Sequence, residues 1–217
     1  MSEEKESRAY KFAKGNGIMN LPNKLTVSRM VMIPVFIALF YVQFAGHYFV
    51  ALAVFALACL TDLLDGKIAR KYNLVTNLGK FLDPIADKVL VLSALVVMLT
   101  VPEIFTENVN FGGWAIIVAG CGVALILARE IIVSGFRMVA ASTGMVIAAD
   151  IFGKYKTTAQ DIAIVILLTG AGVCELTEHI AGVIINYIGL GFFAISVILT
   201  VISGVNYLVK NREVLKT

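Results

Sequence analysis

The stretch TDLLDGKIARKYNLVTNLGKFLDPIADK (residues 61–88) places four aspartates in two otherwise apolar segments. Asp62 and Asp65 are three positions apart and Asp83 and Asp87 are four apart, so each pair shares one face of a helix. The polar turn between the segments is short, which predicts two antiparallel helices. At about 1.5 Å per residue, the carboxylates lie roughly 8 to 16 Å inward from this turn. The sequence therefore predicts an acidic cluster at one depth.

The composition of the whole chain predicts a membrane protein. Of its 217 residues, 59% are apolar and 15% are charged, whereas roughly 25% are charged in a soluble domain. A chain of this size has too much surface to bury so many apolar side chains in water. We expect an all-α integral membrane protein with six transmembrane helices and no nucleic-acid partner. The apolar runs are residues 25–44, 47–69, 76–101, 114–139, 157–174 and 180–207.

The basic residues predict an orientation. All 18 Lys and Arg fall near the two termini, the turn after the second predicted helix, or the loop after the fourth, and the other three loops have none. The positive-inside rule then places both termini and the acidic cluster at the cytoplasmic face, as in a bacterial inner membrane. Residues 1–20 are expected to form a cytoplasmic juxtamembrane segment, either an interfacial amphipathic helix or a disordered tail. Residues 21–217 form the predicted six-helix domain.

Four carboxylates at this depth require positive charge. A single Asp near the centre of a span costs about 2.5 to 3.5 kcal/mol, and four of them also repel one another. Oxygen ligands without His or Cys favour Mg²⁺ or Mn²⁺, and four carboxylates balance two such ions. A pair of divalent metals is typical of sites that act on phosphate groups. The cluster therefore predicts a two-metal site.

Ion pairing is the structural alternative to metal binding. Lys67, Arg70, Lys80 and Lys88 all lie near the aspartates in the sequence. However, Lys67 and Lys88 do not share the helix face of the neighbouring aspartate. Intramembrane acids are more often functional than structural, which favours the metal site.

Small residues and one arginine accompany the acids. Gly66, Ala69 and Gly79 would let a bulky ligand approach the backbone, although helix packing also explains them. Arg70 offers a planar donor for phosphate, or an interfacial anchor. Eight positions form one spaced pattern, Asp62-x2-Asp65-Gly66-x2-Ala69-Arg70-x8-Gly79-x3-Asp83-x3-Asp87.

This pattern resembles the motif of the CDP-alcohol phosphotransferase family at all eight specified positions. The resemblance implies that an acceptor hydroxyl attacks the β-phosphorus of a CDP-linked lipid and releases CMP. It implies that Asp62, Asp65 and Asp83 hold metal ions, and that Asp87 is either a metal ligand or the general base. We take Asp87 as the expected catalytic residue. The nucleotide is expected to border Gly66, Ala69, Arg70 and Gly79.

A group of four cations predicts the acceptor. Arg129 and Arg137 lie in REIIVSGFRMVAA (residues 129–141), and Lys154 and Lys156 lie in GKYKTTAQ (residues 153–160), which also contains Gln160. Such a concentration of cations suits a phosphate dianion, and positive-inside anchoring is the alternative.

Three stretches extend the resemblance beyond the motif. REIIVSGFRMVAA, GKYKTTAQ and MNLPNKLTVSRMVMIPVF (residues 19–36) are similar to family members that join glycerol 3-phosphate to the phosphatidyl group of CDP-diacylglycerol. Asn23, Thr26 and Arg29 occupy consecutive turns of one helix face in the last stretch and are expected to border the nucleotide.

Two alternatives to this function remain open at the level of sequence. The first is the same chemistry with another acceptor, such as an inositol phosphate, serine or a phospholipid. The second is a divalent-cation transporter, although transporter sites normally lie near the midplane. Relatives in this family are expected to be homodimers within membrane lipid. Small residues that permit close helix contacts are Ala53, Ala56, Gly120 and Gly122.

Overall fold

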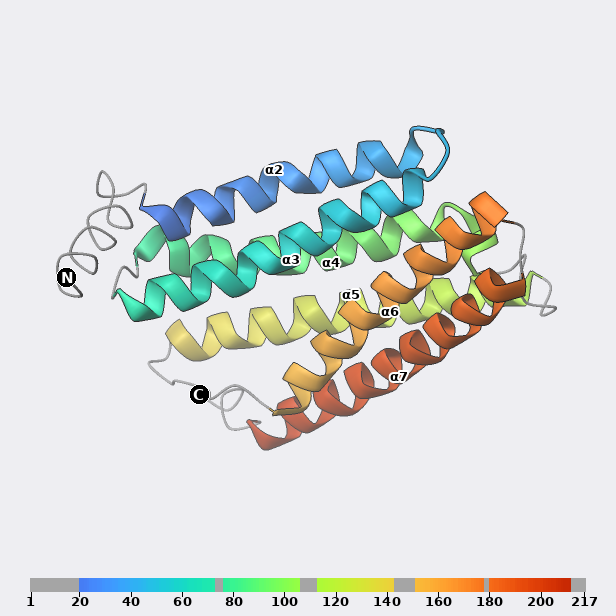
Figure 1. Ribbon diagram of the computed structural model, residues 1–217. Coiled ribbons are helices and arrows are strands. Elements are labelled where there is room, and N and C mark those ends of the chain that lie inside the picture. The colour runs from blue at the N-terminus through green and yellow to red at the C-terminus, as the bar shows by residue number, and fades with distance from the viewer. Residues whose placement is uncertain (1–19, 73–75, 106–112, 143–150, 178–179, 212–217) are drawn as a thin grey trace. The chain divides into compact units, whose positions relative to one another are not determined.

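The computed structural model describes residues 20–72, 76–105, 113–142, 151–177 and 180–211. The described residues form six α-helices and one short 3-10 helix (Figure 1). The predicted all-α fold is confirmed, while the predicted juxtamembrane segment lies, apart from Asn20, outside the described residues. The elements are α2 (Leu21–Tyr41), α3 (His47–Lys71), α4 (Asn77–Leu99), η1 (Pro102–Ile104), α5 (Trp114–Ser142), α6 (Ile151–Thr177) and α7 (Ile180–Lys210).

Five of the six described helices are long and apolar enough to cross a membrane, namely α2, α3, α5, α6 and α7. Helix α4 differs because every membrane-length stretch of it contains Asp83, Asp87 and Lys88. Large apolar side chains point outward, with Ile131 71% exposed and Met138 72% exposed. An apolar exterior of this kind suits lipid rather than water. The chain is therefore an all-α, multi-pass membrane protein.

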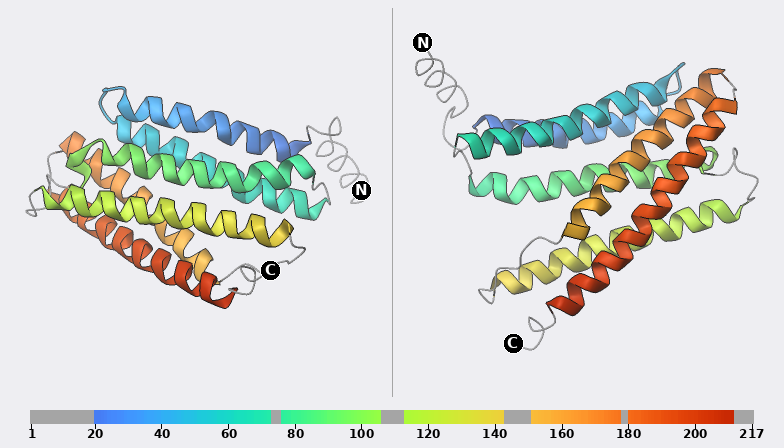
Figure 2. Two further views of the ribbon diagram at one scale, coloured as in Figure 1. Left: turned by 180° about the vertical axis from the view of Figure 1, so that it is seen from behind. Right: turned by 60° about the horizontal axis from the view of Figure 1, so that its bottom comes forward.

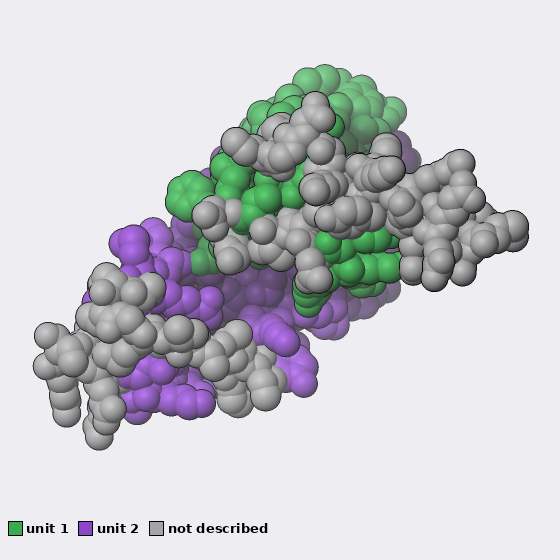
Figure 3. All heavy atoms as spheres, turned by 90° about the vertical axis from the view of Figure 1, so that its left-hand side faces the viewer, with its two compact units in different colours: residues 1–93 green, residues 94–217 purple. Residues whose placement is uncertain are grey.

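The chain divides into two compact units, Met1–Ser93 and Ala94–Thr217 (Figure 3). The boundary between them in the sequence falls within α4. In the first unit, α2 and α3 lie side by side (Figures 1 and 2). The rings of Phe36 and Phe55 are fully buried, with their centroids 6.0 Å apart. Ala51 and Ala58 are also fully buried, because small side chains allow helices to approach closely in lipid.

The capped start of α2 determines on which side of this helix its polar residues lie. Asn20 is the N-cap, and its Oδ1 accepts a hydrogen bond from the backbone N–H of Asn23 at 3.0 Å. Pro22 lies in the first turn, where its missing N–H costs no helical hydrogen bond. The helix then continues regularly, so that Asn23, Thr26 and Arg29 all lie on its buried side.

In the second unit, α6 and α7 lie side by side (Figure 2). Small residues allow the close contact between them. A Cβ added to Gly170 would lie 2.0 Å from Oδ1 of Asn186, and one added to Gly182 would lie 2.4 Å from Sγ of Cys174. Helix α7 also packs against α5. There Gly122 faces Phe193, whose ring would lie 3.0 Å from an added Cβ. Gly122 therefore serves contacts within this chain.

Candidate active site

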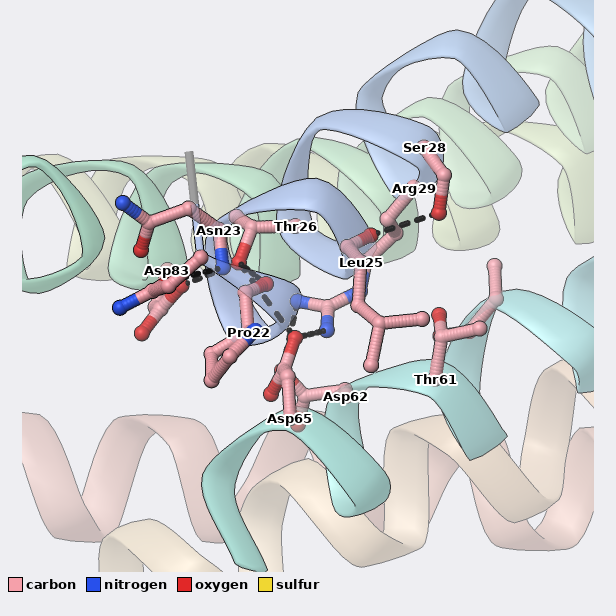
Figure 4. Close-up of polar contacts among 12 residues, drawn as sticks. Pro22, Asn23, Leu25, Thr26, Ser28, Arg29, Thr61, Asp62, Asp65 and Asp83 are labelled. Carbon is pink, nitrogen blue, oxygen red and sulfur yellow. Dashed lines mark hydrogen bonds and ion pairs between the residues drawn. The ribbon is translucent and has the colours of Figure 1, made fainter. Parts of the chain in front are cut away.

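A buried arginine joins two of the motif aspartates. Arg29 of α2 reaches α3, where its Nη1 lies 2.6 Å from Oδ1 of Asp62 and its Nη2 lies 2.5 Å from Oδ2 of Asp65 (Figure 4). The side chains of Arg29, Asp62 and Asp65 are 0%, 38% and 4% exposed. The cation beside these two acids therefore comes from another helix. Arg70, an expected neighbour, instead donates its Nε to the carbonyl oxygen of Gly66.

Thr26 connects the acids of α3 and α4. Its buried hydroxyl lies 2.6 Å from Oδ1 of Asp83 and 3.4 Å from Oδ2 of Asp65 (Figure 4). The shorter contact is the hydrogen bond that the single hydroxyl proton makes best. Three of the four motif aspartates thus meet two side chains of α2. Asp87 is half-buried one turn beyond Asp83 on α4.

A second polar link ties α2 to the start of α4. Asn23 donates its Nδ2 to the hydroxyl of Thr76 at 2.9 Å, and that hydroxyl accepts the backbone N–H of Gly79 at 3.0 Å. Thr76 therefore caps α4. A Cβ added to Gly79 would lie 2.8 Å from Oδ1 of Asn23. Gly79 makes room for Asn23. The sequence predicted that the third apolar run starts at Thr76, but not that Thr76 caps the helix, although a Thr before a helix is a capping signal.

The other motif positions are more open. Among the described residues, a Cβ added to Gly66 would meet only Nη2 of Arg70, at an ordinary contact distance of 3.7 Å. Ala69 is half-buried and Arg70 is exposed. This edge of α3 therefore has space beside the acids.

The donor chemistry of the acidic cluster fits a divalent metal ion. Its ligating atoms are carboxylate oxygens with one hydroxyl nearby, which are the ligands that Mg²⁺ and Mn²⁺ prefer. Among the described residues, no three Asp, Glu, His or Cys side chains close around a single point in metal-binding geometry. Arg29 supplies positive charge to two of the acids. Three carboxylates against one guanidinium still leave an excess of negative charge for a cation.

A basic cluster forms around one acid in the second unit. Glu130 of α5 is 8% exposed, and its Oε1 accepts hydrogen bonds from Nη1 of Arg129, at 2.9 Å, and from Nζ of Lys156. Arg129 also donates its Nη2 to Oγ of Ser203 at 2.7 Å. The structure therefore brings Arg129 and Lys156 together. Sequence reasoning gave no role to Glu130 or Ser203.

Nε of Arg129 in this cluster and Nε2 of Gln160 on α6 are buried without an acceptor in the described part of the chain, as is Nε of Arg29 in the first unit. Gln160 is 2% exposed and follows Lys156 by one turn of α6. A buried donor without a partner costs free energy, so such donors indicate a place for an oxygen-rich ligand.

The remaining two predicted cations lie in different surroundings. Arg137 is exposed, donates its Nε to Oη of Tyr207 at 3.2 Å, and lies 5.4 Å from the centroid of that ring. Lys154 is exposed at the start of α6. The four predicted phosphate ligands thus include one close pair, one stacked arginine and one exposed lysine.

These features define the class of protein. The model of the CDP-alcohol phosphatidyltransferase family matches residues 19–205, and the chain belongs to this family. It is accordingly a phosphatidyltransferase of phospholipid biosynthesis, and the predicted resemblance is confirmed. The family is generally dependent on divalent metal ions.

The curated relatives are more specific. The chain is 39% identical over 215 residues to the CDP-diacylglycerol--glycerol-3-phosphate 3-phosphatidyltransferase of Bacillus subtilis (strain 168), covering 92% of this chain and 99% of that protein. It is 36% identical over 191 residues to proteins of the same name from Salmonella typhimurium and Shigella flexneri. Those matches cover 87% of this chain and 93% of each relative.

Proposed function

We propose that this chain transfers the phosphatidyl group of CDP-diacylglycerol to glycerol 3-phosphate, which yields phosphatidylglycerophosphate and CMP. The observation that carries the proposal is the meeting of Asp62, Asp65 and Asp83, from two helices, at Thr26 and Arg29. The names of the relatives support the two substrates.

The acids of the first unit hold the metal in this proposal. Asp62, Asp65, Asp83 and Asp87 bind two ions of Mg²⁺ or Mn²⁺, which neutralise charge on the pyrophosphate. Thr26 and Arg29 hold three of these carboxylates in place. The nucleotide borders this group at Asn23, Thr26, Arg29, Gly66, Ala69, Arg70 and Gly79.

Asp87 is the proposed catalytic residue. Its carboxylate takes the proton of the acceptor hydroxyl while the acceptor oxygen forms a bond to the β-phosphorus. The bond from this phosphorus to the CMP oxygen breaks, and CMP leaves. A carboxylate near metal ions is a weak base, so positioning and charge neutralisation supply most of the acceleration.

The basic cluster of the second unit binds the phosphate of the acceptor. Its four proposed ligands are Arg129, Arg137, Lys154 and Lys156. The buried N–H groups of Arg129 and Gln160, which have no acceptor in the described segments, support this assignment. Glu130 limits the positive charge there, so that the cluster remains stable before the acceptor binds.

We also propose that α4 is a sixth membrane span and that the site faces the cytoplasm of a bacterial inner membrane. Metal ions would screen Asp83 and Asp87 within α4, and the distribution of Lys and Arg supports the orientation. A homodimer is proposed as well, with Ala53, Ala56 and Gly120 as small residues at helix surfaces. An added Cβ at Gly120 meets no atom of the described residues within 4 Å.

The test of the proposed function is a comparison of acceptors. Purified protein in detergent receives CDP-diacylglycerol, Mg²⁺ and either glycerol 3-phosphate, inositol phosphate, serine or glycerol, and CMP release is measured. We expect release with glycerol 3-phosphate, loss with a chelator, and recovery with Mn²⁺. Faster release with another acceptor would replace the proposed substrate. Transport of Mn²⁺ into vesicles without any CMP release would contradict the enzymatic proposal.

A further inference from the structure

We propose that Ser203 and Tyr207 of α7 are positioning residues that set the affinity of the enzyme for the acceptor phosphate. The two side chains lie one helical turn apart and contact Arg129 and Arg137 of α5. The proposal rests on the proposed function, in which both arginines bind that phosphate. It concerns contacts within the second unit alone.

Ser203 fixes the direction of Arg129. Ser203 is fully buried, and its Oγ accepts a hydrogen bond from Nη2 of Arg129 at 2.7 Å. The aliphatic part of Arg129 lies against the same helix, since a Cβ added to Gly204 would be 3.0 Å from its Cγ. Glu130 binds Nη1 of the same guanidinium. Both terminal nitrogens are thus held, and Nε of Arg129 is buried without an acceptor among the residues that the structure describes, so that it can donate to a phosphate oxygen.

Tyr207 holds Arg137 by its ring and its hydroxyl. The ring is 2% exposed and packs edge-on against Phe136, with centroids 5.9 Å apart and planes at 77°. Val133 and Ala140 complete the cluster around it. Arg137 stacks 5.4 Å from the ring centroid and donates its Nε to the phenol oxygen at 3.2 Å. An exposed arginine is thus tied to a rigid side chain.

The geometry of the Arg137 contact matches phosphate binding. A guanidinium bonded through Nε keeps its two terminal nitrogens for a second partner, and their spacing suits two phosphate oxygens. In a protein without Tyr207, the side chain of Arg137 would be mobile until the acceptor binds. The conformational entropy that it loses on binding would then reduce the affinity for the acceptor. Helix α7 therefore prepares both arginines before the acceptor arrives.

The experiment compares three single variants in the full-length protein. Ser203→Ala and Tyr207→Phe each remove a hydroxyl that bonds an arginine, and Tyr207→Phe keeps the packed ring. The matched control is Thr200→Val, because Thr200 is fully buried on the same helix and donates its hydroxyl to the carbonyl of Ser196, one turn earlier in α7. Each test variant should raise the KM for glycerol 3-phosphate about three- to tenfold, as expected for one lost hydrogen bond. The kcat, the KM for CDP-diacylglycerol and all constants of the control should change less than about twofold.

A double-variant comparison separates positioning from general stability. If Tyr207 acts through Arg137, Tyr207→Phe should raise the KM further by less than about twofold in an Arg137→Gln protein. A purely structural role for Tyr207 would instead give the same loss with and without Arg137, together with a lower kcat. That result would overturn the proposal.

A binding measurement separates this proposal from the proposed function. The melting temperature is recorded with increasing glycerol 3-phosphate, without CDP-diacylglycerol. The wild type should be stabilised, and Ser203→Ala and Tyr207→Phe should need about three- to tenfold more ligand for the same shift. An equal response of the variants and the wild type, or no response of the wild type, would overturn the positioning role. Absence of CMP release with a normal binding series would contradict only the proposed transfer reaction.

Discussion

The acidic cluster and the basic cluster of this chain have the same arrangement of charges with the signs reversed. In the first unit, the acids Asp62 and Asp65 share the guanidinium of the buried Arg29. In the second unit, the cations Arg129 and Lys156 share the carboxylate of the buried Glu130. In each case a buried charge of the minority sign pairs with two charges of the majority sign.

The difference between the clusters indicates which ligand each one accepts. Asp83 adds a further carboxylate to the first cluster through Thr26, so that acids outnumber the arginine. In the second cluster, two cations face one carboxylate, so that positive charge is in excess. Within the described residues, both clusters hold a buried arginine Nε without an acceptor, that of Arg29 in the first and that of Arg129 in the second. An excess of carboxylate oxygen suits divalent cations, whereas an excess of arginine and lysine suits a phosphate. The same principle of partial neutralisation therefore produces two complementary sites.

The largest expected effect comes from the acid that is assigned to proton transfer. Asp87→Asn should lower CMP release by about 10³-fold, because it removes both a base and negative charge near the metals. The matched control is Glu103→Gln, which changes an exposed acid in η1. Its turnover should stay within about twofold of the wild type. Turnover of Asp87→Asn at the wild-type rate would remove this residue from the mechanism.

The second largest effect is expected for Arg29, the buried cation between Asp62 and Asp65 in the first unit. Arg29→Gln leaves Asp62 and Asp65 close together without their cation, which should lower the unfolding free energy by about 3 kcal/mol in chelator. Mg²⁺ should recover much of this loss, because it replaces the missing positive charge. Thermal unfolding with chelator and with Mg²⁺ measures both effects.

Lys67→Gln is the matched control for Arg29→Gln. Lys67 is an exposed cation two residues from Asp65, so its removal should change the unfolding free energy by less than about 0.5 kcal/mol. Equal destabilisation of the two variants would show that the contacts of Arg29 with Asp62 and Asp65 contribute no more to stability than an exposed lysine does.

The mirror-image change in the second unit should have a smaller effect. Glu130→Gln removes the acid between Arg129 and Lys156, and should lower the unfolding free energy by about 1 to 2 kcal/mol. Inorganic phosphate should recover stability in this variant, whereas Mg²⁺ should not. The cross experiment, phosphate with Arg29→Gln, should show no recovery. Recovery of Glu130→Gln by Mg²⁺ would contradict the assignment of opposite ligands to the two clusters.

The smallest effect concerns the open edge of the acidic cluster. In the described part of the chain, a methyl group added at Gly66 makes a van der Waals contact with Arg70 and no closer one. Gly66→Ala should therefore leave the melting temperature nearly unchanged. The KM for CDP-diacylglycerol should nevertheless rise about threefold to tenfold, because the methyl occupies space proposed for the nucleotide. Steady-state kinetics with varied CDP-diacylglycerol provide the measurement. An unchanged KM would place the nucleotide elsewhere.

Local features of the fold were predictable from the sequence. The six apolar runs correspond to six observed helices, since helix length and apolar composition are properties of short segments. Helix boundaries were less accurate. Helix α6 begins at Ile151 rather than at residue 157, because the polar residues Lys154 and Lys156 continue the helix beyond the apolar run. Helix α2 begins at Leu21 rather than at residue 25, because Asn20 caps it.

Contacts between helices were not predictable in the same way. The motif predicted that each aspartate pair shares a helix face, but not that Arg29, 36 residues before Asp65, lies beside it. The pairing of Glu130 with Lys156 spans 26 residues and depends on how α5 and α6 pack. Ser203 and Tyr207 lie within a long apolar run, residues 180–207, and no role was predicted for them. Polar residues spaced by one turn in such a run are the signal that would have indicated them.

Binding of Mn²⁺ in the absence of both substrates tests the central claim most directly. The measurement is the electron paramagnetic resonance signal of free Mn²⁺ during titration of purified protein. The wild type and Glu130→Gln should both bind Mn²⁺, and the double variant Asp65→Asn with Asp83→Asn should lose this binding. Equal Mn²⁺ binding by the double variant and the wild type would contradict the claim that the acids of the first unit form the metal site.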